Sequence, residues 1–167
     1  RRYPFINAAE YFSGIDSHPK LNFIYACIED ITNQLITKIN TDKTAVLFID
    51  TYNNHGSIEQ RRIFVKLMNQ NCKTPVVIGR AYANLAIEDL QLFSATDFGT
   101  LFIDGLGDGI FLAAENCGPD KIINQTAFGI LQATRTRISK TEYISCPSCG
   151  RTLFDLQETT AKIRAVT

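Results

Sequence analysis

The stretch Ala45-Val46-Leu47-Phe48-Ile49-Asp50 decides the fold of this chain. Five apolar residues follow one another without interruption, between a polar turn at residues 40–43 and an aspartate. A strand that is exposed on one face alternates apolar and polar residues, whereas a strand of a parallel sheet is covered on both faces. The uninterrupted run therefore predicts a buried strand over residues 45–49 in a parallel sheet.

Helix and strand patterns alternate on the C-terminal side of this strand. After a loop at residues 51–56, Ser57-Ile58-Glu59-Gln60 matches a capping box, which marks a helix start. The expected helix has an apolar stripe of Ile58, Phe64, Val65, Leu67 and Met68. We predict further strands at residues 75–78 (closed by Gly79), 100–103 and 110–113, and further helices from Asn84 through Phe93 and from Pro119 to about Arg137.

The N-terminal 40 residues are expected to be mainly helical. A short helix is predicted around residues 7–12, and Ser17-His18-Pro19 is typical of a helix start. Apolar residues then recur at spacings of three and four: Leu21, Ile24, Ile28, Ile31, Leu35 and Ile39. This periodicity predicts one long helix over residues 19–39. A strand at residues 23–27 is the competing interpretation, which the unbroken periodicity disfavours.

Strand–helix units at similar spacing, without hairpin signals between them, predict an α/β fold with a mainly parallel sheet and flanking helices. The sheet is expected to be open or an arc of a β/α barrel. We assign residues 1–140 to this α/β domain. Residues 141–167 form a short C-terminal appendage, with its own turn chemistry and a helix over residues 153–164.

Composition excludes several classes of function. The 167 residues have a formal net charge of zero, so nothing favours nucleic acid or an anionic membrane as a partner. No run is apolar and long enough to span a bilayer, and no signal-peptide pattern is present. Cys27, Cys72 and Cys117 are isolated and are expected to be free thiols, which fits a reducing, cytoplasmic location. The absence of an initial methionine suggests a fragment.

Polar residues follow two of the predicted strands. Asp50, with Asn53 and His55 just beyond it, and Asp104 would lie at carboxyl ends of strands, where parallel α/β proteins place their sites. A paired carboxylate or a His–Asp couple is the functional interpretation. The alternative, which we favour, is that these residues end strands and accept hydrogen bonds from nearby amides in turns.

The segment Asp104-Gly105-Leu106-Gly107-Asp108-Gly109 is rich in glycine, which would allow a phosphate to approach the backbone. Its spacing matches neither the dinucleotide fingerprint nor the P-loop, and Leu106 stands where a calcium loop needs an oxygen ligand. Two aspartates would also repel phosphate. A strained turn between two short strands is therefore the preferred interpretation.

The sequence Cys146-Pro147-Ser148-Cys149-Gly150 forms a knuckle in which two sulfurs can face one centre. Gly150 permits the tight turn, and Thr152 and Asp155 are expected to cap the following helix. Three interpretations remain open: a thioredoxin-like redox pair, half of a zinc ribbon, and half of an iron–sulfur site. A basic cluster surrounds the knuckle, either as helix C-terminal charge or as an attraction for an anion: Arg135, Arg137, Lys140 and Arg151.

The blocks TEYISCPSCGRTLFDLQ (residues 141–157) and LFIDGLGDGIFL (residues 101–112) closely resemble the C-terminal half of the 4-hydroxy-3-methylbut-2-enyl diphosphate synthase family of the non-mevalonate isoprenoid pathway. The resemblance is specific from about residue 100 to the end. Over residues 1–99 it rests on the α/β pattern and its position. The large, three-domain type fits best, with an inserted domain between an N-terminal barrel and a C-terminal cluster domain.

This resemblance implies an oxidoreductase that opens methylerythritol cyclodiphosphate with two electrons from a 4Fe–4S cluster, supplied by ferredoxin or flavodoxin. In the family, three cysteines and a glutamate hold the cluster. Cys146 and Cys149 match the first two cysteines, whereas the other ligands are expected beyond Thr167 and the diphosphate-binding residues before Arg1. The chain is thus expected to be a structural insert plus the start of the cluster domain, and to be inactive alone. A further hypothesis is that the insert is a degenerate relative of the barrel.

Two other functions stay open at this stage. The first is a zinc-knuckle interaction module on an α/β domain. The second is an independent α/β enzyme that uses Asp50, His55 and Asp104.

Overall fold

A computed structural model describes residues 2–14, 17–144, 146, 150 and 153–166 of the chain. The chain divides into two compact units, Arg1–Arg137 and Ile138–Thr167. No helix in the described part is long and apolar enough to cross a membrane.

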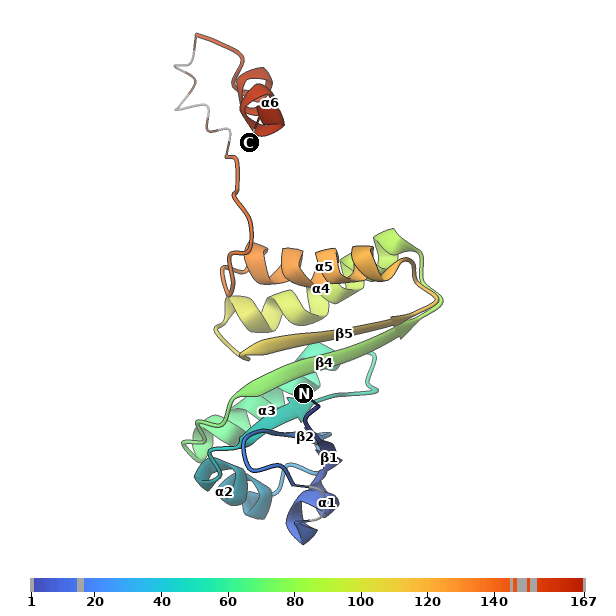
Figure 1. The fold of residues 1–167 in the computed structure, drawn as a ribbon, viewed down its shortest axis with the longest axis vertical. Coiled ribbons are helices and arrows are strands. Elements are labelled where there is room, and N and C mark those ends of the chain that lie inside the picture. The colour runs from blue at the N-terminus through green and yellow to red at the C-terminus, as the bar shows by residue number, and fades with distance from the viewer. Residues whose placement is uncertain (1, 15–16, 145, 147–149, 151–152, 167) are drawn as a thin grey trace. The chain divides into compact units, whose positions relative to one another are not determined.

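The first unit is built on a five-stranded sheet in which the strands neighbour one another in chain order (Figure 1). The strands are β1 (Phe5–Asn7), β2 (Asn22–Ala26), β3 (Ala45–Ile49), β4 (Val76–Ala83) and β5 (Gly109–Glu115). All neighbouring pairs are parallel. The predicted α/β fold with a parallel sheet is therefore confirmed, and the uninterrupted apolar run at residues 45–49 is β3. In the part of the chain that the structure describes, β1 and β5 do not pair with each other, so the sheet is an open arc.

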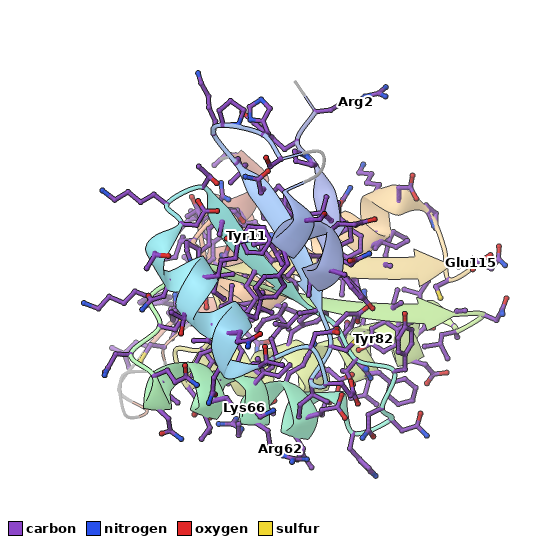
Figure 2. The ribbon with its side chains drawn as sticks, turned by 90° about the horizontal axis from the view of Figure 1, so that it is seen from below. Arg2, Tyr11, Arg62, Lys66, Tyr82 and Glu115 are labelled. Carbon is purple, nitrogen blue, oxygen red and sulfur yellow. The ribbon has the colours of Figure 1, made fainter. Side chains whose placement is uncertain are left out.

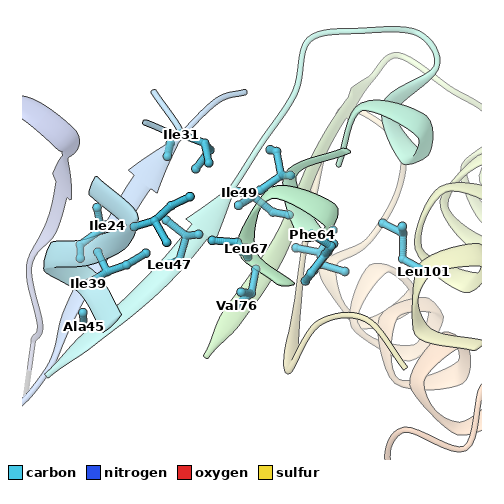
Figure 3. Packing of buried hydrophobic residues seen from close by; sticks show 14 of the residues in the cluster. Ile24, Ile31, Ile39, Ala45, Leu47, Ile49, Phe64, Leu67, Val76 and Leu101 are labelled. Atoms are coloured by element: carbon cyan, nitrogen blue, oxygen red, sulfur yellow. The ribbon is translucent and has the colours of Figure 1, made fainter. Parts of the chain in front are cut away.

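The helices of this unit are α1 (Ala8–Ser13), α2 (Asn33–Thr41), α3 (Gly56–Asn69), α4 (Ile87–Ile103) and α5 (Asp120–Ala133). Right-handed crossovers between successive parallel strands place such helices on the same face of a sheet. The core lies between this helical layer and the sheet. Apolar strand residues such as Leu47 and Val76 pack there against Phe64 and Leu67 of α3 and Leu101 of α4 (Figure 3).

The long helix predicted over residues 19–39 is wrong. The structure has β2 at residues 22–26 and a separate helix α2, so the disfavoured strand is the correct interpretation. β2 pairs with β1 and β3 on its two sides, and this pairing outweighs the helical spacing of the apolar residues. The Ser17-His18-Pro19 segment starts no helix. Instead, the His18 amide donates to the side chain of Asn22 (2.7 Å), the first residue of β2.

The strand predicted at residues 100–103 is also wrong, because these residues form the last turn of α4. The strands predicted at residues 75–78 and 110–113 are confirmed but too short. β4 continues through Gly79 to Ala83, and β5 extends to Glu115. β4 and β5 pair over seven registers, from Val77 with Gly109 to Ala83 with Glu115. They project beyond the other strands, with Tyr82 and Glu115 near their ends (Figure 2).

The helix starts differ in how well they were predicted. The short helix near residues 7–12 is α1, where Asn7 and Glu10 form a reciprocal capping box. Helix α3 exists as predicted, but it begins at Gly56, so Ser57 does not cap it. Its predicted stripe is only partly correct. Phe64 and Leu67 are buried, whereas the following members of the stripe are exposed: Ile58, Val65 and Met68. Helix α4 begins at Ile87, after Ala86 rather than Asn84, and α5 begins at Asp120, after Pro119.

The second unit contains helix α6 (Leu156–Val166). Asp155 caps it by accepting a hydrogen bond from the Glu158 amide (2.9 Å). Glu158 also forms an ion pair with Lys162 one turn later (2.7 Å). The predicted capping role of Asp155 is thus confirmed in a changed form, because Asp155 is itself the cap. Thr152, the other predicted cap, lies outside the described residues.

Candidate functional site

The carboxyl edge of the sheet opens between β3 and β4. The two strands pair only from Leu47 with Val76 to Ile49 with Ile78. Where this pairing ends, the buried Gln60 of α3 donates from Nε2 to the carbonyl of Gly79 (2.8 Å) and to that of Ile49 (3.4 Å). One helix side chain therefore satisfies the strand carbonyls that the diverging backbone would leave unpaired. The Gln60 Oε1 atom has no hydrogen-bond partner among the described residues.

Arg80 fills the gap just beyond this point. Its Nη1 donates to the carbonyls of Thr51 (2.9 Å) and Asn53 (3.1 Å), and its Nε donates to Asp97 of α4 (2.8 Å). The guanidinium packs on Gly56, where an added β-carbon would lie 2.5 Å from the Arg80 Cζ atom. Arg80 thereby ties the loop after β3 to helix α4.

Arg80 and Asp97 form a buried ion pair, with side chains only 9% and 13% exposed. Burial alone would lower the pKa of Arg80, but the neighbouring Asp97 and Tyr82 outweigh it, so the pKa lies above its ordinary value. Tyr82 donates a hydrogen bond to the same carboxylate (2.8 Å). Burial, and then this hydrogen bond, raise the pKa of Tyr82. Both groups therefore keep their protons at neutral pH.

A cavity of about 840 Å³ lies above this ion pair. Its walls come from the loop after β3, the end of β4 and helix α4, and include Asp50, Tyr52, Asn53, Arg80, Tyr82 and Asp97. The Arg80 charge is already neutralised by Asp97, and Asp50 adds a second carboxylate. These hydrogen bonds thus serve mainly to hold the edge together, and the described residues give the cavity no net positive charge with which to hold a phosphate.

The predicted residues after β3 make local turns. The Asp50 carboxylate accepts from the next amide, Thr51 (2.8 Å), and Asn53 accepts from the His55 amide (2.9 Å). His55 itself is exposed just before α3. These contacts fit the turn interpretation of Asp50 and Asn53, and among the described residues no hydrogen bond joins Asp50 to His55.

Asp104 does not lie at this edge, which corrects the paired-carboxylate hypothesis. It follows the last turn of α4 and pairs there with Arg61 of α3. The glycine-rich segment that starts at Asp104 joins α4 to β5, rather than two strands as predicted. Asp108 accepts from the amide of Val76, the first residue of β4 (2.8 Å). The segment therefore lies at the amino edge of the sheet, opposite to Asp50.

Three cysteines lie in the α/β unit, and none is in a disulfide. Cys117 is buried, and Cys27 and Cys72 are partly buried. Burial raises the pKa of the Cys27 thiol, although a hydrogen bond with Tyr25 opposes this shift. These cysteines are therefore free of disulfides, and their assignment as free thiols rather than metal ligands stays a prediction.

The cysteine knuckle is only partly described. Cys146 is exposed, and Cys149 lies outside the described residues. Gly150 has a φ of +77°, the left-handed conformation that was expected for a tight turn after the second cysteine. Within the described residues, no three His, Cys, Asp or Glu side chains are grouped to hold a metal. Of the basic cluster, Arg137 lies over the Phe128 ring (5.7 Å), and Arg151 is outside the described residues.

Comparison with curated proteins gives matches over almost the whole chain. A 4-hydroxy-3-methylbut-2-en-1-yl diphosphate synthase (flavodoxin) from Parabacteroides distasonis is 46% identical over 165 residues, which is 99% of this chain. The Bacteroides thetaiotaomicron protein of the same name is 40% identical over the same share. Over nearly its whole length the chain is thus similar to a segment of the 4-hydroxy-3-methylbut-2-en-1-yl diphosphate synthases.

Plant members of this synthase family also match. The chloroplastic synthase (ferredoxin) of Arabidopsis thaliana is 44% identical over 64% of the chain. The chain spans only 27% of the length of the two bacterial synthases and 14% of the plant protein. It is therefore related to one segment of these synthases. No family model matches the chain, and no solved structure matches it.

Arg80, Tyr82 and Asp97 were not among the site residues predicted from the sequence. The strand prediction ended at Gly79, so Arg80 was not assigned to a strand. Asp97 lies inside α4, where an acidic residue gives no signal of a buried partner. The one sign in the sequence was that Arg80, a charged residue, directly follows the apolar run at residues 75–79.

Proposed function

We propose that this chain is an internal segment of a 4-hydroxy-3-methylbut-2-enyl diphosphate synthase. The whole protein would reductively open a cyclic diphosphate with two electrons and loss of water, as the family resemblance implies. The observation that carries the proposal is the 46% identity to a synthase over 99% of the chain. The names of the relatives, flavodoxin in bacteria and ferredoxin in plants, support a small electron-carrying protein as the partner. A cytoplasmic location is part of the same proposal.

Cys146 and Cys149 are proposed to supply two thiolate ligands to a 4Fe–4S cluster. Such clusters take four protein ligands, and thiolate is the usual one. Two thiolates do not complete a cluster site, and the described residues offer no group of three ligands. The remaining ligands must therefore come from other parts of the polypeptide. The exposure of Cys146 and the left-handed turn at Gly150 are compatible with sulfurs that face an external centre.

The α/β unit is proposed to act as a structural insert rather than as an active site. Its most polar buried groups, Arg80 and Asp97, are used to hold the loop after β3 against α4. Asp50 and Asp104 lie at opposite edges of the sheet and cannot act together. We therefore expect the 167-residue chain to have no synthase activity by itself.

Anaerobic iron–sulfur reconstitution of the full polypeptide tests the role of the two cysteines. The wild-type protein is expected to bind about four iron atoms, as a four-iron cluster requires. Cys146→Ser and Cys149→Ser should each lose most of the bound iron. The partly buried Cys72 offers a matched control, and Cys72→Ser should keep the cluster. Full iron binding by both knuckle variants would refute the proposal.

The zinc-knuckle module remains the rival function, because a Cys-x-x-Cys turn suits both metals. It predicts one tightly held zinc per two 167-residue chains, since each chain gives two thiolates. It also predicts that the full polypeptide takes up no iron. Metal analysis of both proteins separates the two functions.

A further inference from the structure

The cavity at the carboxyl edge of the sheet has the size of a site for a small organic molecule. Its volume of about 840 Å³ lies within the usual range of ligand sites, about 300–1,000 Å³. Part of its lining comes from Asp50, Tyr52 and the loop that follows β3, and another part comes from Leu92 and Phe93 of α4.

Large apolar side chains line this cavity without being buried. Tyr52 is 85% exposed, Leu92 is 62% exposed and Phe93 is 45% exposed. Apolar side chains that gather at a cavity and stay exposed mark a surface that binds an apolar group. Tyr52 is nevertheless anchored at its tip, because its hydroxyl is hydrogen-bonded to that of Tyr25 (3.1 Å). This bond holds the Tyr52 ring at the cavity.

The charged side chains of the lining leave one carboxylate in excess. Asp50 and Asp97 are the two acids, and Arg80 is the one cation among the described residues that line the cavity. Arg80 and Asp97 neutralise each other through their ion pair (2.8 Å). In the described part of the chain Asp50 has no ion-pair partner. Its negative charge is therefore available to a ligand.

The aromatic rings differ in the same way. Arg80 already lies over the Tyr82 ring, with its Cζ atom 5.6 Å from the ring centroid. Within the described residues the rings of Tyr52 and Phe93 carry no such cation. These two rings and the Asp50 carboxylate are thus the unmatched groups of the cavity.

Unmatched rings and a carboxylate suit an organic cation. A carboxylate attracts an ammonium group and repels an anion, and the faces of aromatic rings attract the same group, as in the aromatic cages that bind quaternary ammonium ligands. A hard metal ion would need several oxygen ligands, and the described residues hold no group of three His, Cys, Asp or Glu side chains. We propose that this cavity binds a small organic cation, with Asp50 beside its ammonium group and Tyr52 and Phe93 against its ammonium and apolar parts.

The loop that carries Asp50 is already fixed in place. One Asp50 oxygen accepts from the Thr51 amide (2.8 Å), the Thr51 carbonyl accepts from Arg80 (2.9 Å), and the Thr51 hydroxyl donates to Glu59 of α3. A ligand therefore pays little to order this side of the cavity, which favours binding. The site uses only residues of the α/β unit and needs no catalytic group. Its failure would leave the cluster chemistry proposed above untouched.

An ammonium group can also come from a lysine side chain in another part of the full polypeptide. Such a lysine would fill the cavity there, so that an added cation would bind to the 167-residue chain alone. A free small molecule, which is the source we propose, would bind to both proteins.

Titration with choline, followed by ligand-observed NMR, tests the site in the full polypeptide and in the 167-residue chain. The matched neutral probe is 3,3-dimethylbutan-1-ol, in which a carbon atom replaces the choline nitrogen. Potassium chloride at about 0.15 M keeps the salt physiological and supplies a competing inorganic cation. Choline is expected to bind to both proteins at least about tenfold more tightly than the neutral alcohol, because only choline carries the charge.

The variants separate the site from a general effect of charge. Asp50→Asn can still accept from the Thr51 amide but has no charge, and it should weaken choline binding at least about tenfold. Tyr52→Leu should weaken it by a similar factor, and this exposed position should tolerate the change. Asp104→Asn, which removes an exposed carboxylate at the opposite edge, should bind choline as the wild type does. Circular dichroism checks that each variant is folded.

Three results would overturn the proposal. The first is a wild-type protein that binds no choline or binds the neutral alcohol equally well. The second is a folded Asp50→Asn variant whose affinity for choline falls no further than that of Asp104→Asn. The third is binding to the 167-residue chain alone, which would identify another part of the polypeptide as the occupant.

Discussion

Phe48 lies over Gly79 so closely that an added β-carbon would stand 2.7 Å from the ring atoms. The glycine is required by this neighbour rather than by a turn, because it lies inside strand β4. The position explains how an aromatic side chain of β3 can contact Phe111 of β5, two strands away (centroids 5.2 Å apart).

Replacing Gly79 by alanine should therefore destabilise the α/β unit. We expect a loss of about 1–3 kcal/mol in the free energy of unfolding, because Phe48 must move or distort the strand. Gly129 of α5 is the matched control, since a β-carbon there meets nothing within 4 Å. Gly129→Ala should be neutral or stabilise by up to about 1 kcal/mol. Urea unfolding measures the change in unfolding free energy for both variants. Equal changes would contradict the close contact between Gly79 and Phe48 as the reason for the glycine.

The Arg80–Asp97 pair is expected to be important for stability. Arg80→Met leaves the Asp97 carboxylate buried without its cation, and it leaves the Thr51 and Asn53 carbonyls without their donor. We expect a loss of about 3–5 kcal/mol in the free energy of unfolding.

The exposed pair of Arg61 and Asp104 is the control for this prediction. Its side chains are 42% and 49% exposed, compared with 9% and 13% for Arg80 and Asp97. Arg61→Met should cost at most about 1 kcal/mol, because solvent screens the pair. Chemical unfolding should show a clearly larger loss of unfolding free energy for Arg80→Met than for Arg61→Met. A loss for Arg80→Met as small as that for Arg61→Met would contradict the importance given to burial.

Asp42 should make stability depend on pH in the acid range. Partial burial opposes its charge, but hydrogen bonds from Thr44 and Tyr11 outweigh this and hold the pKa of Asp42 below its usual range. The folded state therefore loses this proton more readily than the unfolded state. The contribution of Asp42 is fully present above about pH 4, the ordinary aspartate pKa, and is lost as the pH falls through the lower folded pKa.

The difference in unfolding free energy between the wild type and Asp42→Asn is thus expected to be constant from pH 5 to 7 and to shrink below about pH 4. Tyr11→Phe removes one of the hydrogen bonds and should show a weaker form of the same dependence. If this free-energy difference instead grows as the pH falls, the pKa of Asp42 is not lowered by folding and the prediction is wrong.

The sequence predicted the fold best where apolar residues are continuous. The run Ala45–Ile49 shows no helical periodicity, and it correctly predicted a buried parallel strand. The residues of β2 were wrongly predicted to be helical, and the last turn of α4 was wrongly predicted to be a strand. Short apolar segments fit both periodicities, and the pairing of β2 with strands distant in the chain decided the outcome.

The candidate site was less predictable because its parts come together only in three dimensions. Arg80 and Asp97 are 17 residues apart and belong to a strand and a helix. Asp50 and Asp104 each follow an apolar run and looked equivalent, yet the second run is the end of a helix that returns to the opposite edge. The cysteine pattern and the family resemblance were local in sequence, and the resemblance was confirmed by comparison with known proteins.

We propose that Cys146 and Cys149 of this chain serve the active centre of a reductive synthase. The most direct test of this proposal is turnover of methylerythritol cyclodiphosphate by the full polypeptide, reconstituted anaerobically and supplied with reduced flavodoxin. We expect turnover by the wild type and by Cys72→Ser, a loss of at least about a hundredfold for Cys146→Ser and Cys149→Ser, and none by the 167-residue chain. Wild-type rates in either knuckle variant, or turnover by the 167-residue chain alone, would contradict the claim.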